Sequence, residues 1–338
     1  MILHNGISVR RMLKDSRGFI FVVLAWTAIV VMVDDFVTVD LSPPVTVLGL
    51  TVAFFLGFKN TSAFARWWEA RNIWGEVVNS SRDWGNVISN LVGKDGTPVD
   101  EEIRRTLIER HIAWLNMLAY QLRTSSRVSR GRKPWMFGHE WQLDRLELHQ
   151  TTESWRAKQL DEDLPLLEDK DNKAVFLLKR QGEMVSSLAQ TGIIEPYWQV
   201  ALMERLARLA DAQGRCERIK NTPFPRQIAE VGRIFSWIFI FLLPFAFHDQ
   251  RDIAWDFNLT FLLSAFHDWL SLAPIGGLVC WVFYVTEQVS ASMEDPFDGG
   301  VTDVPISALC RNIEIDLRQM TGWGMVPSPT QPIERALY

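Results

Sequence analysis

The stretch FFLGFKNTSAFARWWEARNIWG (residues 54–75) starts as apolar as a membrane core and ends in a segment rich in tryptophan and charge. Its first five residues carry no polar side chain, whereas Arg66, Trp67, Trp68 and Glu69 place two adjacent tryptophans between opposite charges. Tryptophan is enriched where a helix leaves the hydrocarbon of a bilayer. The stretch therefore predicts one long helix, with membrane at one end and water at the other.

The composition limits the classes of protein to consider. The chain has 338 residues, a net charge of -5 and 48% hydrophobic residues, a share near the globular average. The mild charge gives no reason to expect a nucleic-acid partner. Cys216, Cys280 and Cys310 lie far apart without a CxxC pair, which indicates reduced thiols in a protein that faces mainly the cytosol.

Four apolar runs stand out, at residues 18–33, 45–58 with a weakly polar extension to 64, 234–247 and 269–285. Each core is shorter than the ~20 residues that cross a bilayer comfortably, so a buried helix of a soluble protein is the alternative for any single run. The charges between the runs favour membrane spans.

Basic residues flank the runs on one side only. Arg10, Arg11 and Arg17 precede the first run, Lys59 and Arg66 follow the core of the second, and further arginines precede the third. Positive charge is retained on the cytoplasmic side of a membrane. Four transmembrane helices with both termini in the cytosol follow. The two outer loops are acidic, with a single Arg251 among Asp34, Asp35, Asp40, Asp249, Asp252, Asp256 and Asp268.

The segments between the runs predict a large cytosolic part made of helices. Residues 101–123, 173–188 and 195–219 read as helices, the first with clear helical periodicity, and strand signals are nearly absent. The fold class is thus an all-α membrane protein. Its predicted organisation is a cytosolic N-terminal segment (1–17), transmembrane helices 1 and 2 (18–64), a cytosolic helical domain (65–230), transmembrane helices 3 and 4 (231–286) and a cytosolic C-terminal segment (287–338).

The second run carries a regular apolar stripe. Leu50, Phe54 and Phe58 recur every four residues and share one face of a helix, while Ala53 and Gly57 permit a close neighbour. Such a stripe is usually a packing face. Around the axis of an oligomer it would instead form a hydrophobic constriction that gates by excluding water.

The end of this helix carries its predicted anchors. Trp67 and Trp68 anchor the helix at the cytosolic interface. Arg66 and Glu69 are three residues apart, so they can pair along the helix.

The stretch at 54–84 strongly resembles the bestrophin family, in particular its bacterial branch. Three further stretches agree: LSPPVTVLGL at 41–50, CERIKNTPFP at 216–225 and EDPFDGG at 294–300. The resemblance runs from the basic N-terminus to about Met320, and the motifs keep their order relative to the four apolar runs.

The resemblance implies a homopentameric, largely helical ion channel in the bacterial inner membrane, with one axial pore. The second membrane helix of these channels lines a narrow apolar neck. The shared LGF…RWW frame places that neck at Leu50, Phe54 and Phe58. By register, a cytosolic aperture falls at Pro196, Tyr197 and Trp198.

Calcium opens eukaryotic bestrophins through a run of acidic residues after a Pro-Phe-Gly segment. This sequence departs from that pattern, because only Asp295, Asp298 and Asp303 follow at loose spacing. Calcium favours six to eight oxygen ligands, several of them carboxylates. Calcium gating is therefore doubtful, and neither a cofactor nor a bound metal is expected.

The sequence leaves open whether the channel selects cations or anions. Eukaryotic relatives pass chloride. Five copies of the acidic outer loops would instead enrich cations at the pore mouth, which slightly favours monovalent cations such as sodium. If those loops only reflect the positive-inside bias, an anion channel remains the alternative.

Other classes of function are less favoured. The sequence has no HExxH, Walker, GxGxxG or GxSxG pattern, so no enzyme is expected. A membrane-anchored cytosolic scaffold without ion flux is the alternative from another class. A secondary transporter is disfavoured because four spans show no inverted repeat. The expected partners are membrane lipids, further copies of the chain and permeating monovalent ions.

Overall fold

A computed structural model of the chain describes residues 12–14, 16–33, 41–124, 161–222, 224–247, 259–299 and 302–331. These residues form α-helices and one 3-10 helix, and no β-strand occurs among them. The elements are α2 (Arg17–Val33), α3 (Ser42–Ser89), α4 (Glu101–Thr124), α6 (Leu164–Leu167), α7 (Lys173–Gln190), α8 (Pro196–Asn221), α9 (Arg226–Leu242), η3 (Leu243–Phe247), α10 (Leu259–Ser292) and α11 (Ile306–Thr321).

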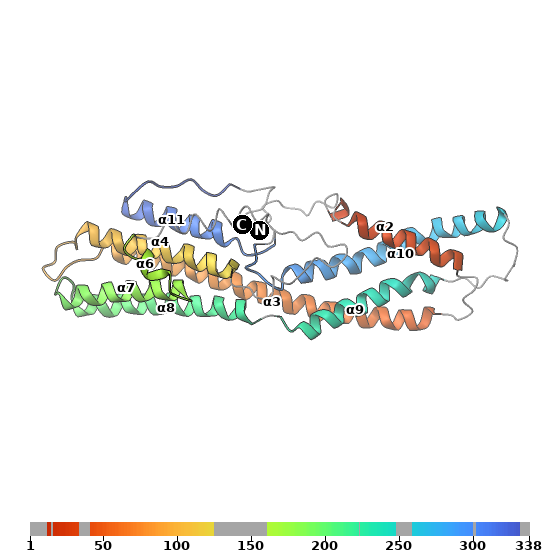
Figure 1. The fold of residues 1–338 in the computed structure, drawn as a ribbon, viewed down its shortest axis with the longest axis horizontal. Helices are drawn as coiled ribbons and strands as arrows, with labels where there is room; N and C mark the ends of the chain where they lie inside the picture. Colours follow the sequence, from red (N-terminus) through yellow and green to blue (C-terminus); the bar gives the residue numbers. More distant parts are fainter. Residues whose placement is uncertain are drawn as a thin grey trace.

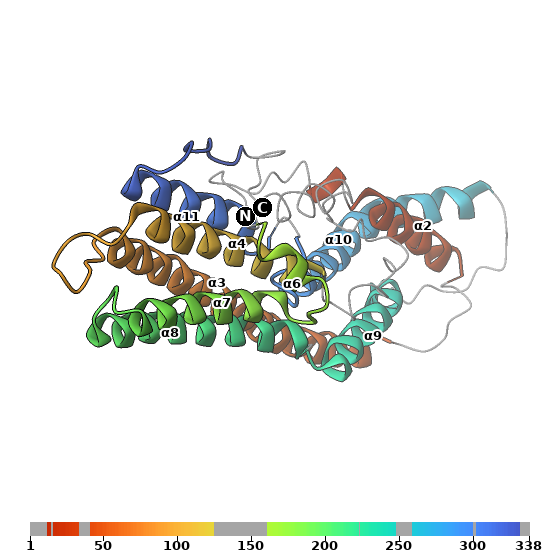
Figure 2. The ribbon, with the colours of Figure 1, turned by 60° about the vertical axis from the view of Figure 1, so that its left-hand side comes forward.

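Helix α3 runs through both halves of an elongated molecule. Figure 1 shows α2, α9 and α10 at one end of the molecule and α4, α7, α8 and α11 at the other, with α3 common to both. The turned view of Figure 2 keeps the same two groups. The 48 residues of α3 span about 72 Å at 1.5 Å per residue, more than twice the ~30 Å of bilayer hydrocarbon. The predicted single long helix is confirmed.

The half that contains α2, α9 and α10 has an aromatic and aliphatic core of its own. Val52 and Leu56 of α3 are buried there. Phe19 of α2 stacks on Tyr284 of α10 with ring centroids 4.0 Å apart. Phe239 of α9 packs against α3 at Gly49, where a Cβ atom would overlap its ring. Each of the four apolar runs thus lies in helical structure.

Two of these helices are long and apolar enough to cross a membrane, judged by length and composition alone. They cover Ser42–Ser89 and Gln227–Ala246, and Arg17–Met32 is a shorter apolar helix. The sequence predicts four membrane spans, and that number therefore remains a prediction.

The other half is a helical bundle with a tryptophan-rich core. Trp74 and Trp84 of α3 and Trp114 of α4 are fully buried. The indole of Trp114 donates a 2.8 Å hydrogen bond to Oε1 of Gln213 on α8, which ties α4 to α8. These three tryptophans fill the core of the bundle.

The three helices predicted at residues 101–123, 173–188 and 195–219 are confirmed within about two residues at each end. Local chemistry explains their starts. Asn172 caps α7 by accepting a hydrogen bond from the backbone N–H of Val175, and α8 begins at Pro196, which needs no N–H partner in the first turn. Helix α11, which was not predicted, ends at Gly322 in a left-handed conformation with φ 71°.

Candidate functional site

The open face of α3 carries a row of exposed apolar side chains. Leu50, Phe54 and Phe58 are 69%, 67% and 59% exposed, although neighbouring positions on the opposite side are buried in the core. The rings of Phe54 and Phe58 meet edge to face with centroids 4.5 Å apart. The face is uncovered because α9 and α10 pack against the other side of the helix.

An exposed apolar strip of this kind marks an interaction surface or a lipid-facing one. The structure thus places the three sequence-predicted neck residues on one open face, as their spacing requires. Their role as a neck stays a prediction.

The same face becomes polar beyond the apolar half. Glu69, Glu76 and Asp83 lie 11, 18 and 25 residues after Phe58. These distances are close to three, five and seven helical turns, so the acids continue the side that carries Phe58.

Each of these acids pairs with an arginine of the antiparallel helix α8. Glu69 binds Arg218, Glu76 binds Arg215, and Asp83 binds Arg205 at 3.0 Å. The pairs are partly exposed, so each contributes little to stability on its own. Together they form an acid–arginine ladder along the part of this face that lies in the helical bundle.

The helix exit at Arg66 and Trp67 is fixed by backbone oxygens of other segments. Arg66 donates to the carbonyl of Ile219 at the end of α8, and the indole of Trp67 donates to the carbonyl of Thr302 at 2.9 Å. Burial lowers the pKa of the Arg66 guanidinium, and the nearby carboxylates, led by Asp295, oppose that shift. These contacts hold α3 against α8 and the segment before α11.

The structure differs from the pairing expected between Arg66 and Glu69. Arg66 turns to a carbonyl of α8, and Glu69 binds Arg218 instead. The reason is geometric, since both residues face α8, which offers partners that sequence spacing within one helix cannot reveal. Trp68 projects outward at 51% exposure, beside Phe64 at a centroid distance of 6.2 Å.

A buried charge cluster lies directly behind the apolar stripe. Lys59, one residue after Phe58, is 1% exposed and binds Glu287 at 2.8 Å and Glu294 at 3.2 Å. Arg233 of α9 also reaches Glu287, at 3.4 Å. This cluster joins α3, α9 and α10 at one level.

From the sequence, Lys59 served only as a marker of topology. The signal that could have found the cluster was a pair of glutamates close behind the fourth apolar run, at Glu287 and Glu294. A buried lysine needs such partners.

Three of the four stretches that carried the family resemblance come together at this level. Lys220 of the 216–225 stretch binds Asp298 of the 294–300 stretch, and Glu294 of the latter binds Lys59 of α3. Segments more than 200 residues apart in sequence thus contact one another beside α3, where its apolar part ends.

The residues predicted for a cytosolic aperture lie at the start of α8. Tyr197 is 73% exposed, and Pro196 beside it is exposed as well. Trp198 instead packs against the bundle core, with its ring 5.8 Å from that of Tyr197. The start of α8 lies at the end of the bundle away from α2 and α9 (Figure 1). The outer acidic residues Asp34, Asp35 and Asp40 lie outside the described residues.

Two of the aspartates after α10 have partners within the protein. Asp298 is held by Lys220, and Asp303 accepts the N–H of Gly299 at 2.8 Å. Among the described residues, no group of three or more His, Cys, Asp or Glu side chains could hold a metal ion.

Comparisons with known proteins identify the relatives of this chain. The family model described as "Bacterial/Fungal Bestrophin protein" matches residues 11–319. The voltage-dependent anion channel-forming protein mll4386 of Mesorhizobium japonicum is 24% identical over 338 residues, which cover 99% of this chain and 92% of the relative. The voltage-dependent anion channel-forming protein YneE of Escherichia coli K12 is 27% identical over 290 residues, covering 86% and 80%.

Solved structures share the fold. The crystal structure of a bacterial bestrophin homologue from Klebsiella pneumoniae matches with a TM-score of 0.71 at 22% identity, covering 90% of this chain and 98% of that one. A crystal structure of a substituted variant, described only as a membrane protein, matches with a TM-score of 0.72 at 21% identity, covering 92% and 100%.

Proposed function

Since this chain belongs to the bacterial and fungal bestrophin family, we propose that it is one subunit of a membrane ion channel whose pore is lined by the open face of α3. The observation that carries the proposal is the continuity of that face. Apolar side chains occupy it in the half rich in apolar helices, and the acid–arginine ladder occupies it in the bundle.

The apolar part of the face acts as the neck. Leu50, Phe54 and Phe58 from several copies would surround a passage in which an ion finds no polar partner. A narrow apolar passage excludes water, so small changes in its radius switch conduction on and off. The aromatic pair Phe54–Phe58 sets the narrowest ring.

The assembly is a homopentamer in the bacterial inner membrane, with both termini in the cytosol. Two features support an assembly of this kind. The exposed apolar face of α3 needs a partner, and the family resemblance gives five-fold symmetry around one axis. The basic flanks of the apolar runs support the orientation.

The channel passes small monovalent ions. Separate observations support selectivity for cations and selectivity for anions. The acidic outer loops predicted from the sequence favour cations such as sodium. The names of the relatives, which describe anion-channel formation, favour anions as the second candidate.

The channel does not depend on bound calcium. The aspartates after α10 are already engaged by Lys220 and by the backbone of Gly299, so they offer too few free oxygens for a hard cation. Chelation of calcium on both sides of the membrane should leave the current unchanged.

A reversal potential in a planar bilayer tests the function. The purified protein is measured under an asymmetric sodium chloride gradient. A potential near the sodium equilibrium value establishes a cation channel, and one near the chloride value an anion channel. No current from a correctly assembled protein would contradict the channel proposal and favour the membrane-anchored scaffold.

A further inference from the structure

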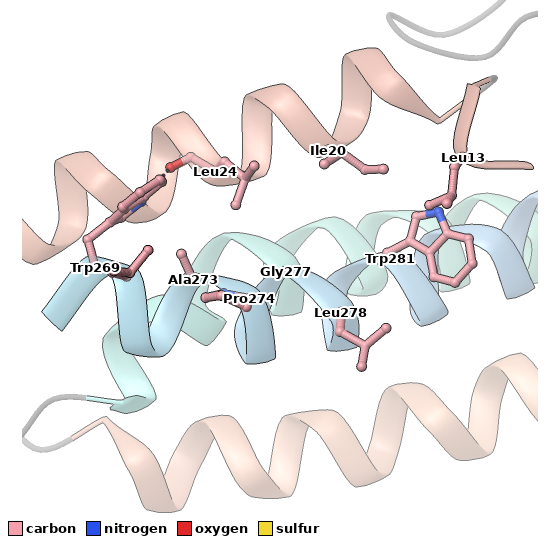
Figure 3. A pocket seen from close by; sticks show the side chains of 10 residues that line it. Leu13, Ile20, Leu24, Trp269, Ala273, Pro274, Gly277, Leu278 and Trp281 are labelled. Atoms are coloured by element: carbon pink, nitrogen blue, oxygen red, sulfur yellow. Dashed lines mark hydrogen bonds between the residues drawn. The ribbon is translucent and has the colours of Figure 1, made fainter. Parts of the chain in front are cut away.

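A hollow opens between α2 and α10, on helices away from the face proposed to line the pore. Its volume is about 580 Å³, and it is lined by Ile20 and Leu24 of α2 and by Ala273, Leu278 and Trp281 of α10 (Figure 3). Leu13 closes one end beside Trp281, and Trp269 closes the other. Apart from two indole nitrogens, the side chains that line it are apolar.

Small residues of α10 create this hollow. Ala273, Pro274 and Gly277 stand where larger side chains would fill the space, and Pro274 also interrupts the helix hydrogen bonds. A Cβ atom added at Gly277 would meet only Leu24 Cδ2, at an ordinary 3.8 Å. The space is therefore open to a ligand and could accept a larger side chain.

One polar group in the hollow has no protein acceptor. The buried indole Nε1 of Trp281 makes no hydrogen bond to any described residue. Two other tryptophans of the same half are satisfied by backbone carbonyls, Trp26 by Phe241 at 3.0 Å and Trp269 by Leu24 at 3.2 Å. A buried N–H without an acceptor is costly, so an oxygen that reached Trp281 would be bound favourably.

Two basic residues follow the end of the hollow closely in the sequence. Leu13 lines the hollow beside Trp281, and the next residue, Lys14, and the first residue of α2, Arg17, are both exposed. From Trp281 to Trp269 the hollow follows twelve residues of α10, or about 18 Å. That length is close to the depth of one bilayer leaflet, about half of the ~30 Å hydrocarbon.

We propose that this hollow is a binding site for an anionic glycerophospholipid of the cytosolic leaflet. One acyl chain lies along Leu24, Gly277 and Leu278, and an ester carbonyl accepts the N–H of Trp281. The phosphate faces Lys14 and Arg17. The assignment to the cytosolic leaflet rests on the membrane topology given with the proposed function. Lipid binding at the site requires no ion flux.

Binding can be measured by native mass spectrometry of the delipidated, detergent-solubilised protein with added palmitoyl-oleoyl phosphatidylglycerol. The wild-type protein should bind one such lipid per chain in preference to phosphatidylcholine. Trp281→Phe keeps the ring and removes the N–H, so the dissociation constant should rise about threefold to tenfold. Gly277→Leu fills the hollow and should weaken binding at least about tenfold.

Matched variants separate the site from general lipid contact. Trp26→Phe removes an indole N–H that the protein already satisfies, and Ile275→Phe adds bulk to an exposed position of α10 outside the hollow. Both should bind the lipid like the wild type. Lys14→Ala with Arg17→Ala should abolish the preference over phosphatidylcholine.

Equal binding by the wild type and Gly277→Leu would overturn the proposal, as would equal losses in Trp281→Phe and Trp26→Phe. If another copy of the chain covers the hollow in the assembly, no lipid binds per chain and the proposal fails. Bilayer currents are measured independently, so failure of the lipid site leaves the channel proposal standing, and the reverse also holds.

Discussion

Lys59 places its amine in a position that almost no water reaches. Changing Lys59 to Met removes the cation and leaves Glu287 and Glu294 buried, with only Arg233 nearby. Breaking a buried pair in this way costs about 3–5 kcal/mol. We expect a clearly lower melting temperature of the detergent-solubilised protein.

A triple variant is the control for that prediction. Adding Glu287→Gln and Glu294→Gln to Lys59→Met removes the uncompensated charges, so most of the lost stability should return. A Lys59→Met protein that melts like the wild type would show that water already screens the cluster.

The neck residues make a prediction about conduction. Phe54→Ala with Phe58→Ala widens the apolar passage and should raise the single-channel conductance roughly twofold or more. Phe55→Ala is the matched control, because Phe55 packs inward with its ring 6.0 Å from that of Phe235. Unchanged conductance in a correctly assembled double variant would mean that the neck lies elsewhere.

His111 links stability to pH. It is fully buried between Trp84 and Trp114, with ring centroids at 6.0 and 5.2 Å, and burial lowers its pKa from 6.5 to about 3, opposed only in part by Gln181. The unfolded chain therefore takes up a proton below about pH 6.5 that the folded chain refuses until about pH 3. Stability falls as the pH is lowered through this window.

The size of that effect can be isolated with one variant. At pH 5 the loss attributable to His111 is about 2 kcal/mol. Thermal melts of the wild type and of His111→Phe at pH 7.5 and 5.0 should differ in their pH dependence by this amount. Parallel pH dependence in the two proteins would contradict the assignment.

At the level of single residues, the sequence predicts which side chains share a face of one helix. The four-residue spacing of Leu50, Phe54 and Phe58 predicts their common face without reference to the rest of the chain. The partners of Lys59 could not be predicted in the same way. Glu287 is 228 residues away, and only the packing of α10 against α3 brings the two together.

Helix α3 contains two glycines that test its packing in opposite directions. At Gly85 an added Cβ would overlap Leu317 of α11, which is fully buried and cannot move aside, so Gly85→Ala should cost about 1–3 kcal/mol. At Gly75 the nearest atom is 3.7 Å away, so Gly75→Ala should stabilise the helix by about 0.5–1 kcal/mol. Melting temperatures that move in the same direction would show that α11 is not packed there.

Among the elements, long periodic helices were predictable and their neighbours were not. Residues 101–123 carry a strong helical pattern, and the structure has α4 at Glu101–Thr124. Helix α11 also has apolar residues at helical spacing, at Ile306, Leu309, Ile313 and Leu317. The expectation for the C-terminal segment rested on its aspartates instead, so this helix was missed although its signal lies in the sequence.

At the scale of the whole molecule, the proposed assembly predicts the mass of the purified particle. The proposed channel is a homopentamer, so the purified particle should weigh about five times the 38.9 kDa of one chain, after correction for detergent. Mass photometry or light scattering measures this directly. A particle of one or two chains would contradict the proposed pore, because too few copies of α3 would be present to surround it.

The architecture of the whole was predictable in outline because the apolar runs and the charges between them are properties of the chain alone. The ladder between α3 and α8 was not, since the acids at 69, 76 and 83 and the arginines of α8 belong to different helices. Pairing between helices depends on tertiary packing, which local periodicity does not encode.

The continuity of α3 has a mechanical consequence. After Pro44 the helix contains no proline up to Ser89, and its part in the bundle packs against α4, α8 and α11. One continuous helix thus joins the bundle to the aromatic rings of Phe54 and Phe58. A partner that rotates the bundle about the axis of α3 should therefore also rotate these two rings.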